Sequence, residues 1–199
     1  MPSALASGNR TIFERELNVT PPTDFNEWGQ LVEAFARHLL DRYGLDEIRI
    51  WFFEVWNEPN LSGFWSGTKE DSWRLSDASA HAIERINPAL RVGGPASSKA
   101  SWITDMIDHC VTTGAPIDFI STHLYPQEEY VDYSDRKDTP HAIGDFFVDT
   151  VRRVQREIHR SLCPTLKSIG PSGIAFPPTP RPICHGSITP PWIPFSEQP

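Results

Sequence analysis

Apolar side chains recur every three or four residues between Asp24 and Tyr43, which is the period of a helix with one buried face. Asp24 supplies an N-terminal cap, and Gly44 supplies a residue at which the helix ends. The same period predicts three further helices, over about residues 70–86, 101–112 and 143–158.

Three segments have the composition of strands. Residues 48–56 are almost continuously hydrophobic and rich in β-branched and aromatic side chains, which predicts a strand buried on both faces. Residues 90–92, closed by a Gly-Gly-Pro turn at 93–95, and residues 117–123 are predicted to be shorter strands. Because helices and strands alternate, we expect an α/β fold of βα units around a parallel sheet. A complete (β/α)8 barrel needs about 250 residues, so the sequence predicts part of a barrel.

Proline divides the chain into two compositionally different parts. Ten of the 19 prolines lie among the last 39 of the 199 residues. We therefore expect a folded domain over residues 1–160 and an irregular, Pro-rich tail over residues 161–199.

Charge and composition exclude several classes of protein. The net charge is −8 and no basic stripe is present, which disfavours nucleic-acid binding. No run of about 18 apolar residues predicts a membrane span. The N-terminus lacks a basic segment followed by an apolar one, so we expect a cytoplasmic protein. The three cysteines lack metal-ligand spacing, and we expect no metal and no other cofactor.

Polar side chains at two strand ends are the candidates for chemistry, because functional groups gather at the carboxyl ends of parallel strands. Asn57 and Glu58 follow the most hydrophobic strand, where burial among aromatic rings favours the neutral, proton-donating form of a carboxylic acid. His123 and Tyr125 follow another strand, and alternation directs both to one side. Three of these residues also have a purely structural interpretation: Glu58 as a turn residue before proline, and His123 and Tyr125 as structural residues with satisfied hydrogen bonds at a strand end.

Residues 51–65, with the sequence WFFEVWNEPNLSGFW, closely resemble the acid/base segment of glycoside hydrolase family 39, the β-xylosidases. Segments 1–8, 18–22, 92–96 and 119–125 agree with the family in order. The resemblance covers about residues 1–160 and implies strands 3 to 6 of a (β/α)8 barrel, a carbohydrate substrate such as a xylo-oligosaccharide or an aryl xyloside, and no cofactor. An α-L-iduronidase-like hydrolase of the same family is an alternative.

The resemblance also implies roles for particular residues. Glu58 matches the general acid/base, and Asn57 matches the amide that binds the sugar 2-hydroxyl. His123 and Tyr125 match a polar pair on the sixth strand. Phe64 and Trp65 would line the sugar sites, although aromatic residues in such a loop are about as often packing residues.

A catalytic nucleophile has no counterpart in the sequence. The family places it on the seventh strand, which would follow the helix that ends near Arg160. The tail instead contains a single acidic residue, Glu197. A permitted back-translation of residues 162–175, read with two nucleotides removed, gives VPHAQIHWTEWNS, which resembles the missing segment. We therefore expect a frame-shifted tail, with a genuine disordered tail as the alternative.

The N-terminal segment resembles the end of the third barrel strand, so the first two βα units are expected to be absent. Such a partial barrel would have open sheet edges, which are sites of self-association. An inactive truncated product or a residual carbohydrate-binding module is the alternative to an active enzyme.

Overall fold

The computed structural model describes residues 1–13, 16–125, 141–160 and 167–169. Among these residues, a parallel four-stranded sheet in the order β3-β4-β5-β6 is flanked by helices, and a small antiparallel pair, β1 and β2, lies near the N-terminus. Along the chain the elements are β1 (Thr11–Ile12), β2 (Leu17–Asn18), α1 (Phe25–Tyr43), α2 (Leu45–Ile48), β3 (Phe52–Glu54), α3 (Lys69–Ile86), β4 (Arg91–Ser98), α4 (Ile103–Thr113), β5 (Phe119–His123), α6 (His141–Arg160) and β6 (Lys167–Ile169).

The four predicted helices are present with nearly the expected bounds. The Asp24 side chain accepts a hydrogen bond from the backbone N–H of Asn26 and caps α1. Gly44 ends α1 with a positive φ of 78°, a conformation that favours glycine. In α3, Thr68 and Asp71 form a reciprocal capping box.

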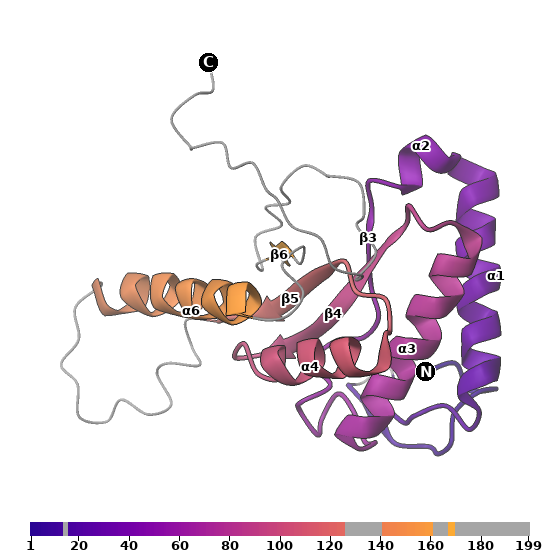
Figure 1. The fold of residues 1–199 in the computed structure, drawn as a ribbon. Helices are drawn as coiled ribbons and strands as arrows, with labels where there is room; N and C mark the ends of the chain where they lie inside the picture. Colours follow the sequence, from indigo (N-terminus) through magenta and orange to yellow (C-terminus); the bar gives the residue numbers. More distant parts are fainter. Residues whose placement is uncertain (14–15, 126–140, 161–166, 170–199) are drawn as a thin grey trace.

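Two hydrophobic clusters attach the helices to one face of the sheet. Figure 1 shows α1 and α3 side by side next to β3 and β4, with α6 next to β5. The first cluster joins Ala36 and Leu39 of α1 to α3 and to Val92 of β4. The second joins α4 and α6 to Ile120 of β5 and to Leu124. Because side chains alternate along a strand, His123 points to the opposite face of the sheet from these helices.

The predicted strand over residues 48–56 is wrong in length and burial. Gly44 ends α1, and the next four residues form α2, where Ile48 is fully buried as a helical residue. Only Phe52–Glu54 is strand, and its side chains are half-buried or exposed rather than enclosed on both faces. The sequence pattern could not separate a short buried helix from a strand because both are continuously apolar.

The predicted turn at residues 93–95 is also wrong, because Gly93, Gly94 and Pro95 lie inside the eight-residue strand β4. Gly93 pairs with Phe119 of β5. A Cβ atom at Gly93 would lie 2.2 Å from the carbonyl oxygen of Phe119, so this glycine permits a close approach of two strands rather than a turn.

The predicted irregular tail over residues 161–199 is wrong at residues 167–169. These residues form β6, which pairs with β5 in parallel. All other residues of the tail, and with them most of the segment expected to be frame-shifted, lie outside the described residues. Within the described ranges, every helix is too short or too polar to span a lipid bilayer.

Candidate active site

Glu58 lies where the chain leaves β3 and crosses toward the end of β4. Its φ is 47°, a left-handed conformation that is uncommon for a residue with a Cβ atom. Its backbone N–H donates to the carbonyl oxygen of Ala96 at 2.9 Å, and Ala96 itself has a positive φ of 52°. Glu58 is buried, with 6% of its surface exposed. Backbone strain of this kind is retained when the surrounding structure fixes it, and it concentrates at functional sites.

The Glu58 carboxylate is held by a histidine from a different strand. Nδ1 of His123, at the end of β5, lies 2.9 Å from Oε1 of Glu58. The imidazole N–H donates to the carboxylate when Glu58 is ionised. The two side chains are 8% and 21% exposed, so the pair is shielded from water but open enough to be reached. An N–H donor at this distance fixes the orientation of the carboxylate.

The structure brings together three of the residues predicted from the sequence: Glu58, His123 and Tyr125. The ring of Tyr125 makes an edge contact with His123, with centroids 6.3 Å apart, and about half of its surface is exposed. Asn57 is exposed beside Glu58. Glu58, His123 and Tyr125 thus place a carboxylic acid against an imidazole that contacts a phenol ring, which suits proton transfer to a ligand rich in hydroxyl groups.

The aromatic residues Phe64 and Trp65 differ in what they offer to a ligand. Phe64 is half-buried and makes an edge contact with Phe13. Trp65 is only 2% exposed; its indole N–H donates to the carbonyl oxygen of Thr68 at 2.8 Å, and its ring packs edge-on against Trp56. The structure therefore gives Trp65 a packing role inside the loop, and its predicted contact with sugar stays a prediction.

Sequence reasoning missed Asn60. Its Oδ1 accepts from the backbone N–H of Ser98 at 2.8 Å, and its Nδ2 donates to the carbonyl oxygen of Ser98 at 3.2 Å. An asparagine after proline is an ordinary turn residue in sequence. No local pattern could reveal that its side chain reaches a strand 38 positions later.

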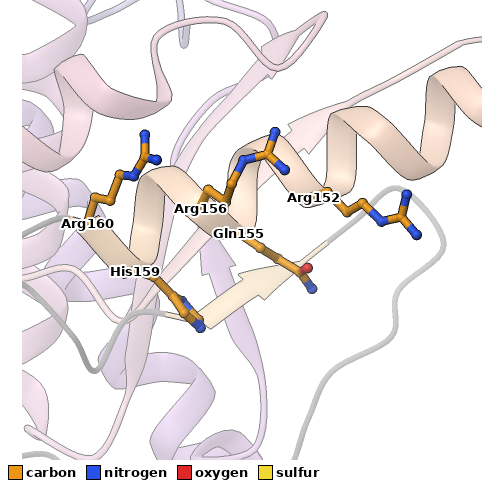
Figure 2. A pocket seen from close by; sticks show the side chains of 5 residues that line it. All are labelled: Arg152, Gln155, Arg156, His159 and Arg160. Atoms are coloured by element: carbon orange, nitrogen blue, oxygen red, sulfur yellow. The ribbon is translucent and has the colours of Figure 1, made fainter.

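A separate pocket of about 310 Å³ lies along α6 and is not part of this site. Figure 2 shows the described residues that line it, which belong to that helix: Arg152, Gln155, Arg156, His159 and Arg160. His159 and Arg160 lie in the last turn of α6, where cationic side chains interact favourably with the helix dipole, so these two residues have an ordinary structural role. Among the residues that the structure describes, no three His, Cys, Asp or Glu side chains gather as metal ligands.

Comparison with known proteins decides the family. The family model for glycosyl hydrolases family 39 matches residues 1–165. The chain belongs to glycosyl hydrolase family 39. This confirms the family predicted from residues 51–65.

Curated relatives are similar to this chain over part of their own length. A β-xylosidase of Caldicellulosiruptor saccharolyticus is 54% identical over 129 residues, which cover 64% of this chain and 26% of that protein. The α-L-iduronidase of Homo sapiens is 34% identical over 135 residues, covering 59% of this chain and 19% of that protein. The chain thus spans about a quarter or less of these curated relatives.

A solved structure supports the same conclusion for the fold. The crystal structure of a monomeric β-xylosidase from Caulobacter crescentus CB15 superposes with a TM-score of 0.74 at 38% sequence identity. The match covers 84% of this chain and 34% of that chain. The parallel sheet and its helices match this β-xylosidase structure, as expected for the predicted partial (β/α)8 barrel.

Proposed function

We propose that the chain supplies the acid/base part of a β-xylosidase-type active site, with Glu58 as the general acid/base. The observation that carries this proposal is the buried Glu58 carboxylate, bonded to His123 where β5 ends. The two residues are 65 positions apart in the sequence; Glu58 follows β3, and His123 is the last residue of β5. Carboxyl ends of parallel strands are where barrel enzymes place their chemistry.

In this proposal Glu58 first donates its proton to the glycosidic oxygen and then, as a carboxylate, removes a proton from the incoming water. The His123 N–H holds the carboxylate in one orientation through both steps, because it bonds Oε1 and leaves Oε2 for the substrate. Asn57 and Tyr125 lie beside this pair and would bind sugar hydroxyls. The partly accessible ring of Phe64 would contact the apolar face of a sugar.

Retaining glycosidases also need a nucleophilic carboxylate about 5 Å from the acid/base. The strand beside β5 is β6, whose residues are Lys167, Ser168 and Ile169, and none carries a carboxylate. We therefore expect that this chain alone does not form a glycosyl-enzyme. A small external anion such as azide would have to attack the anomeric carbon while the aglycone leaves.

The test uses the chain with phenyl β-xyloside and sodium azide, measuring xylosyl azide and phenol. Phenol is a poor leaving group and needs protonation. We therefore expect azide-dependent turnover that falls at least about 100-fold in Glu58→Gln. With 2,4-dinitrophenyl β-xyloside, whose leaving group needs no proton, the loss should be much smaller. Glu54→Gln is the matched control, because Glu54 is exposed in β3, four positions earlier, and its variant should react like wild type.

Three results would separate this proposal from its rivals. Xylose binding without azide-dependent turnover would indicate a residual carbohydrate-binding module. Neither binding nor turnover would indicate an inert product. Faster reaction of an aryl α-L-iduronide than of the xyloside would indicate an iduronidase-like site; the higher sequence identity to β-xylosidases supports the xyloside.

We also propose that the chain associates with a second copy of itself. Among the described residues, β3 is a terminal strand of the parallel sheet. Leu31 and Phe35, one turn apart on the neighbouring helix α1, are 42% and 55% exposed. Unpaired strand edges beside apolar side chains favour association.

A further inference from the structure

The segment after β3 that carries Glu58 and Asn60, here called the Glu58 loop, is attached to β4 by a few hydrogen bonds. These bonds identify a positioning residue. Backbone pairing between β3 and β4 ends at Glu54 and Gly93. Beyond that point the two segments stay in register through single contacts: the N–H of Glu58 bonds the carbonyl of Ala96, and the Asn60 side chain bonds Ser98. The carboxamide of Asn60 hydrogen-bonds both the N–H and the carbonyl of Ser98, as the backbone of a neighbouring strand would.

Ala96, one of the β4 residues that receive these bonds, lies at an irregularity in the strand. The pairing of β4 with β5 shifts in register between Pro95 and Ser97, and Ala96, with its positive φ, is the residue passed over. Such a bulge bends a strand and turns a backbone group out of the ladder. Here the Ala96 carbonyl accepts from Glu58.

These contacts form a closed ring that includes the catalytic pair. Ser98 is the register partner of His123 in β5, and the His123 carbonyl also accepts from the N–H of Lys99. The ring begins with the hydrogen bond between the Glu58 carboxylate and His123 and crosses from His123 to its register partner Ser98. The Asn60 side chain then joins Ser98 to the Glu58 loop, and two residues of backbone lead from Asn60 back to Glu58. The Asn60 side chain closes the return path from Ser98 to the segment that carries Glu58.

We propose that Asn60 is a positioning residue that fixes the Glu58 carboxylate against His123 by clamping the loop to Ser98. The expected effect of Asn60 on catalysis rests on the proposed function of Glu58. The expected effect on the Glu58–His123 hydrogen bond does not. Asparagine suits this role because its short side chain carries both an NH2 donor group and a carbonyl acceptor, whereas an ionised aspartate only accepts and would place a negative oxygen against the Ser98 carbonyl oxygen.

The test compares Asn60→Asp and Asn60→Ala with Asn18→Asp. Asn18 is a matched control, because its Nδ2 also donates to a backbone carbonyl, that of Gly8, and its Oδ1 accepts from a backbone N–H, that of Thr20. The first readout is the set of ¹⁵N chemical shifts of the His123 imidazole, which report hydrogen bonding at Nδ1 and need no turnover. Glu58→Gln supplies the reference for an altered Glu58–His123 bond.

We expect both Asn60 variants to move the His123 shifts toward those of Glu58→Gln, while Asn18→Asp leaves them at the wild-type values with a similar thermal midpoint. The second readout is azide-dependent turnover of phenyl β-xyloside. A misplaced acid lowers kcat by about 10- to 100-fold with little change in KM. His123 shifts that stay at wild-type values in Asn60→Ala would overturn the proposal. If wild type shows no turnover, the proposed function fails while the His123 measurement still decides the role of Asn60.

Discussion

Gly93→Ala is the substitution whose effect the structure determines most sharply. Gly93 is buried in β4 opposite Phe119. An added Cβ atom would lie 2.2 Å from the Phe119 carbonyl oxygen and 2.7 Å from two atoms of its ring. An ordinary contact between carbon and oxygen is about 3.3 Å, so β4 and β5 would have to separate by about 1 Å.

The energetic cost can be worked from that displacement. Overpacking a well-packed site costs about 1–3 kcal/mol. A 1 Å separation also weakens the adjacent bonds between Val92 and Asp118, now 2.8 and 2.9 Å long, each with a net value of about 1 kcal/mol. We therefore expect Gly93→Ala to lower the free energy of unfolding by about 3 kcal/mol.

Gly94→Ala is the matched control. Its Cβ atom would approach only the Ala96 nitrogen, at 3.8 Å, and Gly94 is not among the residues with positive φ. A fitting alanine changes stability by less than about 1 kcal/mol through the unfolded chain. Urea unfolding followed by tryptophan fluorescence should place the Gly93→Ala midpoint about 1.5 M below that of Gly94→Ala, for a slope near 2 kcal/mol/M. Equal midpoints would refute the argument from close approach.

Two further predictions concern charge and association. The Arg85 hydrogen bond and the positive charges of Arg85 and Arg37 hold the pKa of Glu33 below its usual value. A lowered pKa stabilises the fold above the unfolded pKa of about 4.3, and the effect is lost as pH falls through the folded pKa. The urea midpoint of Glu33→Gln should thus lie below the wild-type midpoint at pH 7, and the difference between the two midpoints should shrink toward pH 3. A difference that stays constant with pH would contradict this. Light scattering should show that Leu31→Glu and Phe35→Glu reduce self-association, and a monodisperse wild-type monomer would count against that proposal.

The sequence by itself determined the features that depend on neighbouring residues. The helical period and the caps at Asp24 and Gly44 gave α1 correctly, because both signals act within a few residues. The string around Glu58 indicated the family, and the comparisons confirm that. Residues 48–56 were misread because an apolar run has no period that distinguishes α2 followed by β3 from one long strand.

Only the tertiary structure decided which residues meet. The Glu58–His123 bond joins residues 65 positions apart, and the Asn60 clamp reaches 38 positions along the chain. Gly93 looks like a turn residue until the neighbouring strand is present, since what requires a glycine there is the Phe119 carbonyl. In each case the deciding contact comes from a distant part of the chain, which periodicity and local composition cannot encode.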